Sequence, residues 1–423
     1  MTFSPEQDNL IDKILELKIG APAAGGGFVS HAPDGRVVFV RHAIEGELVR
    51  AVITEETSSY LRADAIGILE PSADRVAPSC PHAGPGRCGG CDYQHIDLTR
   101  QRKFKARRIE EHLARMAGVA IDIHVVGVDG DLAGYGWRTR VGYGVDSEGR
   151  AGFHRYRSHE IETIEQCPLG TRAVNQLGVT EHLWPGVRSI DVSCSFDGAS
   201  RVVVVDTGKN RIDSVPMLEA DLVINGRARI GRARMSYSVL GRNYSVSAGV
   251  FWQVHPGAAA LLGRAVLDAV GDITGQRILD LYCGAGLFSA LLARATGPTG
   301  EVIGVERDHR ACLDARHNTA DLAQVSIIEH SVNAKILTNL GGPPATAVLD
   351  PSREGAGKQV MSALCQYAPT LAKIVYVSCD PATFARDLRV ARDLGWSLQS
   401  IKAFDLFPMT EHVELLAVLV PAT

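Results

Sequence analysis

The sequence predicts an α/β protein whose C-terminal part is a doubly wound, Rossmann-like domain. From about residue 249, apolar strand-like runs alternate with helical patterns, which is typical of a parallel sheet covered by helices. The chain has 423 residues, too many for one ordinary core, so two or three domains are expected. Short β-type runs dominate the preceding half and indicate mainly β domains there.

The first expected domain is a small OB-like β-barrel over residues 1–70. The alternating runs at 36–40 (RVVFV) and 48–53 (LVRAVI) predict strands, and the glycines at 25–27 predict a turn. A five-stranded barrel often binds oligonucleotides, and a simple packing module fits the pattern equally well.

Residues 71–240 are expected to form a mainly β central domain. Its first part, 71–91, is irregular and rich in proline, glycine and cysteine. A basic helix is predicted next, since six of the nine residues at 100–108 (RQRKFKARR) are Arg or Lys. Such a run fits contact with an RNA backbone as well as an ordinary solvated helix face. Residues 135–240 then alternate β-type runs with turns.

The composition predicts a soluble chain that works in the reducing cytoplasm as a monomer, with no membrane partner. The chain is 45% hydrophobic and 22% charged, and polar and acidic residues follow Met1 instead of a signal peptide. Nine cysteines, an odd number, argue against a disulfide framework. The formal net charge of -4 gives no global basic field, so binding of a nucleic acid needs local patches.

Residues 241–423 carry the expected α/β domain, and the segment 278–288 (ILDLYCGAGLF) has the layout of a cofactor site. Gly284 and Gly286 let the backbone approach a ligand closely. The next strand ends at Glu306, whose carboxylate can bind two ribose hydroxyls. The third glycine of a dinucleotide fingerprint is absent, so S-adenosylmethionine is a better ligand than a nicotinamide dinucleotide.

Two more residues are candidates for contact with this cofactor. Asp350 ends the fourth strand of the domain, at the edge where ligands of open α/β sheets bind, although an ordinary helix cap is the alternative. Gln253, in the run FWQV at 251–254, is the polar member of an otherwise apolar segment.

Cys379 is the candidate nucleophile. It ends an apolar strand, and Asp380 and Pro381 make a good N-cap and first residue of a helix. A helix N-terminus lowers the pKa of a nearby thiol, so we expect an activated cysteine, although most free cysteines are small buried hydrophobes. Glu414, the last charge before the apolar run 415–420, is the candidate general base, with a plain strand-edge glutamate as the alternative.

A methyl donor, a thiolate and a base together fit methylation at C5 of a pyrimidine. C5 is too weak a nucleophile by itself. Addition of the thiolate to C6 gives an enolate whose charge lies at C5, and C5 then takes the methyl group from the sulfonium. A base removes the C5 proton, and the thiolate leaves.

Five motifs carry a resemblance to a known family: FWQV, DLYCGAGLFS, LDPSREG, SCDPATFARDL and DLFPMTEHVE. Through them, nearly the whole chain is similar to the S-adenosylmethionine-dependent RNA 5-methyluridine methyltransferases. The resemblance implies that Cys379 is the nucleophile and that Glu414, and not Glu411, is the base. It also implies a cofactor site lined by Gln253, Tyr282, Glu306 and Asp350. Leu287 stands where the family often has an asparagine.

The resemblance extends to the N-terminal half, where the expected barrel is similar to the family's RNA-binding TRAM domain. Many members bind an iron–sulfur cluster through C-x5-C-x2-C and a distant fourth cysteine, and here the spacing is C-x7-C-x2-C. The implied ligands are Cys80, Cys88, Cys91 and Cys167. Four thiolates suit a [4Fe–4S] cluster or structural zinc, and the resemblance favours the cluster. The remaining cysteines are expected to be structural thiols: Cys194, Cys283, Cys312 and Cys365.

Two other functions are weighed against this one. A cytosine-5 methyltransferase uses related thiol chemistry, but many of those enzymes have a Pro-Cys pair on the fourth strand, and here Asp350-Pro351 ends that strand without a cysteine. A non-catalytic RNA-binding protein would not need both Cys379 and Glu414. The RNA substrate is a ribosomal or a transfer RNA.

Overall fold

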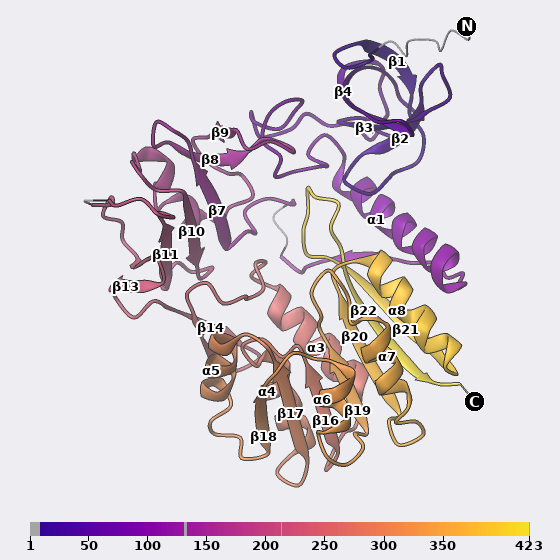
Figure 1. Cartoon of the computed structure of the whole chain (residues 1–423), viewed down its shortest axis with the longest axis vertical. Coiled ribbons are helices and arrows are strands. Elements are labelled where there is room, and N and C mark those ends of the chain that lie inside the picture. The colour runs from indigo at the N-terminus through magenta and orange to yellow at the C-terminus, as the bar shows by residue number, and fades with distance from the viewer. Residues whose placement is uncertain (1–8, 131–132, 213, 423) are drawn as a thin grey trace, which may run out of the picture. The chain divides into compact units, whose positions relative to one another are not determined.

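The computed structural model describes residues 9–130, 133–212 and 214–422 (Figure 1). The chain divides into two compact units. The first comprises Met1–Phe104, Phe153–Ile164 and Pro408–Glu411, and the second comprises Lys105–Gly152, Glu165–Phe407 and His412–Thr423. The expected division into residues 1–70, 71–240 and 241–423 stays a prediction, because the chain passes between the two units several times.

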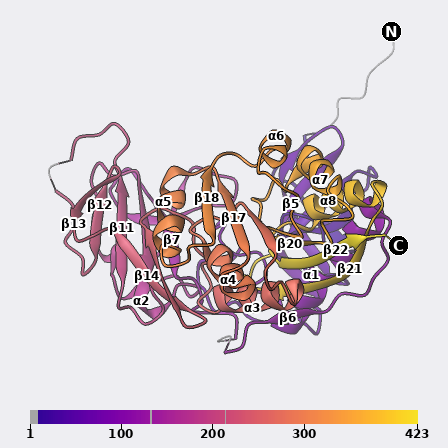
Figure 2. The ribbon, with the colours of Figure 1, turned by 90° about the horizontal axis from the view of Figure 1, so that it is seen from below.

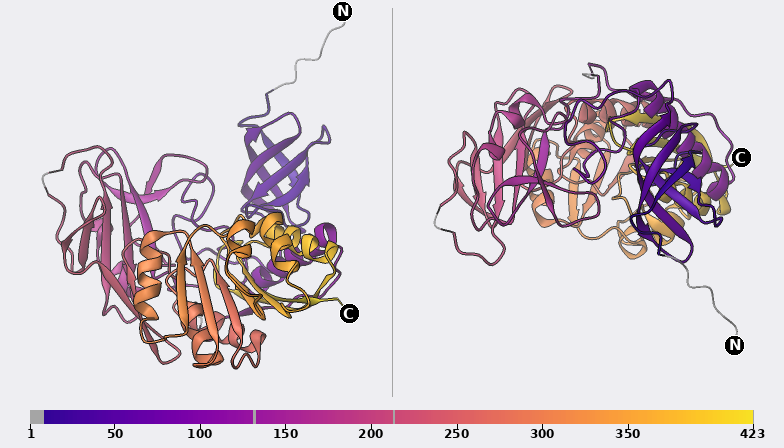
Figure 3. Two further views of the ribbon diagram at one scale, coloured as in Figure 1. Left: turned by 60° about the horizontal axis from the view of Figure 1, so that its bottom comes forward. Right: turned by 90° about the horizontal axis from the view of Figure 1, so that it is seen from above.

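The first unit holds a five-stranded sheet in the part of the chain expected to form a barrel. Its strands are β1 (Ile14–Lys18), β2 (Phe28–His31), β3 (Val37–Arg41), β4 (Leu48–Glu56) and β5 (Tyr60–Glu70). They pair in the order β1-β4-β5-β3-β2. Figure 3 shows this sheet in indigo. Alternate strand residues such as Val38 and Val40 point into a buried core, which also contains Tyr93 and Phe104. The same unit contains β9 (Ile161–Thr163).

The second unit begins with a mainly β region. One sheet contains β7 (Arg140–Val145), β8 (Ala151–His154), β10 (Ser189–Cys194), β11 (Arg201–Asp206), β12 (Asp221–Ile224) and β13 (Arg227–Ile230), in the order β13-β12-β11-β10-β7-β8. β14 (Arg234–Val239) and β15 (Arg242–Ser247) form a separate antiparallel hairpin. Two short helices, α2 (Arg172–Asn175) and the 3-10 helix η2 (Val179–Glu181), lie in this part of the chain.

The C-terminal part of the second unit is a doubly wound α/β sheet, which confirms the predicted fold class. Its eight strands are β6 (Val125–Gly127), β16 (Arg277–Leu281), β17 (Glu301–Glu306), β18 (Val325–Glu329), β19 (Thr346–Leu349), β20 (Lys373–Ser378), β21 (Trp396–Asp405) and β22 (Glu414–Pro421). Their order is β18-β17-β16-β19-β20-β22-β21-β6. β22 runs antiparallel to both neighbours, and the other pairs are parallel.

Helices cover both faces of this sheet. They are α1 (Leu98–His112), the π-helix η1 (Leu113–Ala117), α3 (Ala258–Val270), α4 (Leu287–Thr296), α5 (His309–Asn318), α6 (Ala334–Thr338), α7 (Gly357–Cys365) and α8 (Pro381–Asp393). Figure 2 shows α3 and α4 on one face and α6, α7 and α8 on the other. Within β20, Val375 and Val377 belong to the core under α3 and α4, whereas Ile374 and Tyr376 belong to the core of the opposite face. No helix in the described part of the chain is long and apolar enough to cross a membrane.

Helix α1 contains the expected basic run, but one of its charges points inward. The Lys105 ammonium donates to Asp405 at 2.6 Å and to the carbonyl oxygen of Phe407 at 3.0 Å. Both charged side chains are fully buried. A buried ammonium is tolerated only with such partners. Lys105 therefore holds the C-terminal end of strand β21, and both residues belong to the second unit. Including this residue in an RNA-contacting basic face was therefore wrong.

Candidate active site

Four parallel strands of the second unit end side by side. The register pairs Leu281 of β16 with Val305 of β17 and with Leu349 of β19, and Leu349 in turn pairs with Tyr376 of β20. The residues at or just past these strand ends are Tyr282, Glu306, Asp350 and Cys379. The structure thus brings four of the predicted site residues to the carboxyl edge of one sheet, where α/β proteins bind ligands.

The glycine turn after β16 leaves room for a ligand. Tyr282 and Gly284 both have positive φ, 65° and 52°. A Cβ atom built on Gly284 would meet nothing within 4 Å, whereas one on Gly286 would lie 3.1 Å from the Cα of Ala315 in α5. Gly284 is therefore the position open to a ligand, and Gly286 is a glycine because a helix packs against it.

The Glu306 carboxylate faces this turn. Its Oε2 accepts a hydrogen bond from the Gly284 amide at 3.2 Å, and its Oε1 accepts from the amides of Arg307 and Asp308, each at 2.7 Å. These three amides fix the orientation of the carboxylate. The free acceptor capacity of its oxygens suits the hydroxyls of a ribose lying over Gly284.

Asp280 is a buried acidic residue to which sequence reasoning gave no role. Its side chain is fully buried, and its Oδ2 accepts a hydrogen bond from the Ser289 hydroxyl. The Oδ1 atom has no hydrogen-bond partner among the residues that the structure describes. Burial raises the pKa of Asp280 to about 7. A buried carboxylate oxygen without a partner fits a cofactor that brings a cationic or N–H group, and S-adenosylmethionine carries both an ammonium and a sulfonium.

Gln253 is held by its neighbours in the FWQV segment. Trp252 is buried and stacks on Tyr237 with ring centroids 4.8 Å apart. The carbonyl oxygen of Val254 accepts from the amide of Thr139 at 2.9 Å and from its hydroxyl at 2.7 Å. Gln253 itself is half-buried. The segment is thus anchored on both sides of the amide side chain, which remains accessible.

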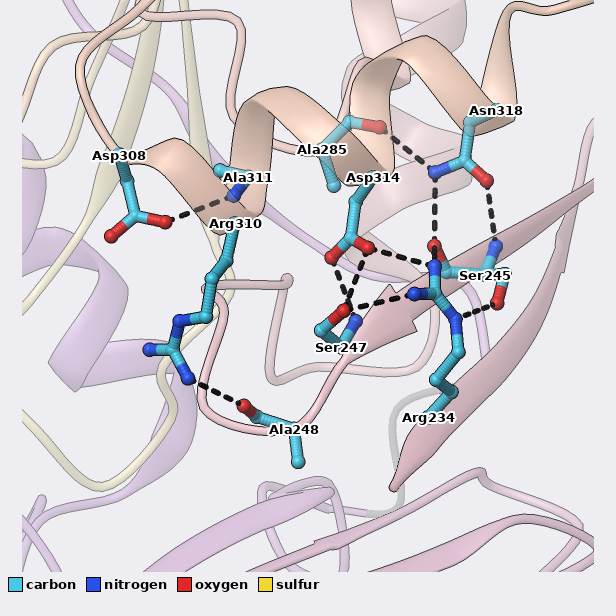
Figure 4. Close-up of polar contacts among 10 residues, drawn as sticks. All are labelled: Arg234, Ser245, Ser247, Ala248, Ala285, Asp308, Arg310, Ala311, Asp314 and Asn318. Atoms are coloured by element: carbon cyan, nitrogen blue, oxygen red, sulfur yellow. Dashed lines mark hydrogen bonds and ion pairs between the residues drawn. The ribbon is translucent and has the colours of Figure 1, made fainter. Parts of the chain in front are cut away.

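A polar network joins α5 to the β14–β15 hairpin that precedes this segment (Figure 4). The buried Asp314 carboxylate accepts from Arg234 Nη2 at 2.7 Å and from the amide and hydroxyl of Ser247 at 2.7 and 2.8 Å. Asn318 accepts from the Ser245 amide at 2.8 Å and donates to the Ser245 carbonyl at 3.1 Å. Helix α5 starts just after β17, which ends at Glu306. The network therefore connects the position of Glu306 with that of the hairpin that precedes Gln253.

Cys379 and Glu414 come together through strand pairing. β20 pairs with β22 up to Ser378 opposite Leu415. Cys379 and Glu414 are the next residues on the two strands, and the charge of Glu414 acts on the Cys379 thiol. The thiol is half-buried, and only 4% of Glu414 is exposed. Residues that lie 35 positions apart in the sequence therefore meet at the same point of the sheet edge.

The surroundings of Cys379 are acidic. Burial raises the pKa of its thiol to about 12, the charges of Glu414 and Asp350 act in the same direction, and Arg353 opposes them. Burial and the charge of Asp350 also raise the pKa of Glu414 well above its ordinary value. The expectation of a lowered thiol pKa at the start of α8 is therefore not met by the protein alone, because burial and the neighbouring carboxylates raise this pKa.

The loop that follows Asp350 is held from α8. Asp387 is fully buried, and its Oδ2 accepts from the amides of Ala356 and Gly357 at 2.8 and 3.0 Å and from the Tyr376 hydroxyl at 2.8 Å. The motif SCDPATFARDL thus supplies the thiol and also, through its aspartate, fixes the loop LDPSREG.

Arg353, in that loop, faces the C-terminal motif. Its Nη2 lies 3.2 Å from Nε2 of His412. His412 also contacts Phe407 edge-on, with ring centroids 6.2 Å apart. Sequence reasoning gave neither Arg353 nor His412 a role, because only the fold shows that the two motifs adjoin.

Leu287 is an apolar residue of the core. It is the first residue of α4 and belongs to the buried cluster under α3 and α4. Leu287, at the position where the family often has an asparagine, therefore packs in the core. Nearby, the Ala285 carbonyl accepts a hydrogen bond from Asn318 at 2.9 Å.

Three of the four predicted metal-ligating cysteines belong to the first unit, namely Cys80, Cys88 and Cys91, and Cys167 belongs to the second. The Gly90 amide donates to Cys88 Sγ at 3.4 Å, and Gln94 Nε2 donates to Cys91 Sγ at 3.1 Å. Such N–H···S bonds suit thiolate ligands. Across residues 9–130, 133–212 and 214–422, however, no three His, Cys, Asp or Glu side chains come close enough to hold a metal ion. The four-cysteine site stays a prediction.

Comparisons with known proteins agree on a class of enzyme. A family model described as tRNA (Uracil-5-)-methyltransferase matches residues 344–421, and one for Protein-L-isoaspartate(D-aspartate) O-methyltransferase matches residues 258–335. An uncharacterized RNA methyltransferase of Streptomyces avermitilis is 43% identical over 429 residues, covering 96% of this chain and 98% of the relative. The 23S rRNA (uracil(1939)-C(5))-methyltransferase RlmD of Acinetobacter baylyi is 31% identical over 429 residues, covering 93% and 91%.

One solved structure is similar over nearly the whole chain. It is the tRNA (uracil-54, C5)-methyltransferase of Pyrococcus abyssi in complex with S-adenosyl-L-homocysteine, with a TM-score of 0.72 and 22% identity, and the match covers 96% of this chain and 100% of that one. This likeness concerns the fold.

Proposed function

Since the chain belongs to the S-adenosylmethionine-dependent RNA uracil-C5 methyltransferases, we propose that it methylates C5 of one uridine in a structured ribosomal or transfer RNA, with Cys379 as nucleophile and Glu414 as base. The observation that supports this proposal is the pairing of Ser378 with Leu415, since Cys379 and Glu414 are the next residues on these two strands and the charge of Glu414 acts on the Cys379 thiol. A thiol and a carboxyl group so placed can act on neighbouring carbons, C6 and C5, of one pyrimidine ring.

The cofactor would be held by Gln253, Tyr282, Glu306 and Asp350. When bound, S-adenosylmethionine supplies the methyl group as an electrophile. Glu306 accepts the ribose hydroxyls, and the open face of Gly284 lets the nucleoside lie against the backbone. The charge of Asp350 acts on both Glu414 and Cys379. A positive group of the cofactor near Asp350 would offset the negative charge that surrounds the thiol.

The chain's own residues act in a definite order. Cys379 Sγ forms a bond to C6 of the uracil, and the electron pair of the C5–C6 double bond moves toward C5 and the O4 carbonyl. After C5 has gained the methyl group, Glu414 takes the C5 proton. The electron pair of that C–H bond restores the double bond, and the Cys379–C6 bond breaks with the thiolate as leaving group. The raised pKa of Glu414 makes its carboxylate a stronger base than an exposed one.

Trapping of the covalent intermediate tests these roles. Cys379→Ala is expected to abolish methyl transfer while cofactor binding is retained, and the wild type is expected to form a stable adduct with 5-fluorouridine RNA, because fluorine at C5 does not leave as a proton does. With ordinary RNA and a radiolabelled methyl donor, Glu414→Gln should accumulate a labelled protein–RNA band on a denaturing gel, which the double variant with Cys379→Ala must lack. Adduct formation by Cys379→Ala, or wild-type turnover by Glu414→Gln, would overturn the respective assignment.

A four-thiolate [4Fe–4S] site at Cys80, Cys88, Cys91 and Cys167 is part of the same proposal, with zinc as the alternative metal. It is supported by the cysteine spacing and by the N–H···S bonds to Cys88 and Cys91. Its role is structural, since no step of the reaction requires electron transfer. We propose a cytoplasmic location for the enzyme. Mapping of 5-methyluridine in RNA from a strain without the gene would identify the target.

A further inference from the structure

Glu411, the acidic residue three positions before Glu414, has a binding site of its own in the first unit. Its Oε2 accepts hydrogen bonds from the backbone amides of Gly25 and Gly26, at 2.7 and 3.0 Å. Both glycines have left-handed backbone conformations, with φ of 83° and 72°. Successive amides in such a turn converge on one point and form a concave anion-binding nest.

The segment Pro408–Glu411 is joined to the same unit at further points. The Met409 carbonyl accepts from the amides of Asp92 and Tyr93 at 2.9 and 3.0 Å, and the Met409 amide donates to Gln101 Oε1 at 2.9 Å. The amide of Glu411 donates to Asp92 Oδ2 at 3.2 Å. These backbone contacts hold one end of the segment, and the nest holds the other.

The Glu411 carboxylate binds this nest close to a second acidic residue, Asp92. Two neighbouring carboxylates repel each other, so the placement of Glu411 indicates a specific role. Burial and the negative charge of Glu411 raise the pKa of Asp92, and Arg41, 3.5 Å from Asp92, only partly offsets this. A neutral residue at position 411 would avoid the repulsion between the two carboxylates. The carboxylate at 411 instead satisfies two amides that would otherwise lack a partner in this turn.

We propose that Glu411 is a positioning residue of the reaction: the bond of its carboxylate to the Gly25–Gly26 nest fixes the segment that leads into the base Glu414. This inference rests on the proposed role of Glu414. Three residues of chain span at most about 10 Å, so a fixed Glu411 limits where the chain can enter β22 and how Glu414 is presented to C5.

The nest can be tested from both sides. Glu411→Ala removes the acceptor, and Glu411→Gln keeps an acceptor oxygen without the charge. Gly25→Ala disfavours the left-handed conformation on the donor side, where an added Cβ would meet only the Tyr156 hydroxyl at 3.8 Å. Gly35→Ala is the matched control, because Gly35 has a φ of 86° in the same unit and nothing within 4 Å of an added Cβ, but no part in the nest.

Amide hydrogen exchange reads the nest without catalysis. In Glu411→Ala, the amides at residues 25–26 and in the segment 408–414 are expected to exchange about 10- to 100-fold faster than in the wild type, the range that corresponds to loss of hydrogen bonds to a charged group. Gly25→Ala should produce a similar change in the segment, and Gly35→Ala should not. Unchanged exchange in Glu411→Ala would overturn the inference.

Kinetics then separates positioning from stability. Glu411→Ala is expected to lower kcat by about tenfold or more with KM for RNA within twofold, to accumulate the same labelled adduct as Glu414→Gln, and to be partly rescued in Glu411→Gln. Faster exchange with normal kcat would show a structural anchor only and overturn the positioning role. If Glu414→Gln forms no adduct, Glu414 is not the base. If, in that case, Glu411→Ala also lowers kcat without forming an adduct, Glu411 does not position a base.

Discussion

The thiol of Cys379 shares the sheet edge with two carboxyl groups, Asp350 and Glu414, and both oppose its ionisation. Burial and these two charges disfavour the thiolate of Cys379 in the protein without ligands. A cation beside Asp350 offsets the two negative charges. If the proposed roles hold, a methyl donor bound beside Asp350 is expected to make the Cys379 thiol easier to ionise.

Asp350→Asn should lower the pKa of Cys379, because it removes one of the charges that raise it. The measurement is the rate of alkylation of Cys379 against pH, followed by mass spectrometry of the peptide in the absence of cofactor. The midpoint is expected to shift to lower pH by about one unit or more. Asp393→Asn, at the exposed end of α8, is the control and should leave the midpoint unchanged. An unshifted midpoint in Asp350→Asn would mean that the charge of Asp350 does not raise the thiol pKa.

For single residues, the sequence proposes the reactive groups but does not indicate their charge states. Cys379 and Glu414 follow from strand ends and motifs, which are local. The raised thiol pKa follows from burial and from the charges of Glu414 and Asp350. These residues are distant in sequence and approach only after β19, β20 and β22 have paired. The unpartnered Oδ1 of Asp280 likewise depends on which strands surround β16.

Among the elements, α8 has two tasks. Its N-terminus follows Cys379, and Asp387, in its second turn, holds the loop between β19 and α7. Asp387 accepts from two amides of that loop and from the Tyr376 hydroxyl, so three donors depend on one carboxylate. The loop carries Asp350 and Arg353. Helix α8 therefore helps to position site residues at the ends of both β19 and β20.

Asp387→Ala should destabilise the protein and weaken activity together. Loss of this carboxylate leaves buried donors without a partner, and each costs about 1–3 kcal/mol, so the free energy of unfolding is expected to fall by about 2–5 kcal/mol. Denaturant unfolding measures it. Asp393→Ala on the same helix should stay within about 0.5 kcal/mol of the wild type. Equal stability of the two variants would refute the holding role of Asp387.

The elements also show where sequence patterns suffice. Alternating apolar runs predict the buried parallel strands of the α/β sheet, because each such strand is covered on both faces. The basic run in α1 predicts a helix but not the burial of Lys105, since the partner Asp405 comes from a strand about 300 residues later. Strand β6 is too short to carry a pattern, and only pairing with β21 identifies it.

For the whole molecule, buried acids make stability depend on pH. The pKa of Asp280 is raised from 3.8 to about 7 in the native state. Between these values the native state holds a proton that the unfolded chain has released, so the free energy of unfolding falls as pH rises from about 4 to about 7. The contribution is fully present only below about pH 4.

Chemical denaturation between pH 5 and about 7.5 checks this dependence. The wild type should lose stability relative to Asp280→Asn as pH rises, because the amide does not ionise. S-adenosylmethionine should reduce the loss in the wild type, since a cationic ligand favours the carboxylate. Parallel curves for the two proteins would show that Asp280 does not titrate in this range.

The metal content is also a property of the whole chain, because the four cysteines come from both units. Protein purified without oxygen is expected to be brown, with about four irons per chain. Cys167→Ser should lose iron, and Cys194→Ser, at a buried thiol outside the proposed set, should keep it. Colourless protein with one bound zinc would show that the metal is zinc and not an iron–sulfur cluster. If Cys167→Ser kept its full metal content, Cys167 would not be a ligand.

Strand β6 leaves the ribosome long before its partner exists. β6 ends at Gly127, whereas β21 ends at Asp405, about 280 residues later. At roughly 5–20 residues per second, the nascent chain waits about 14–56 s before this edge of the sheet can form. During that time the apolar side chains of η1, Ile123 and Val125 lack the α8 and β21 surfaces that bury them in the finished protein. Synthesis of the last quarter of the chain is therefore the step at which the sheet closes, and the waiting segment is the part of the nascent protein most in need of a chaperone.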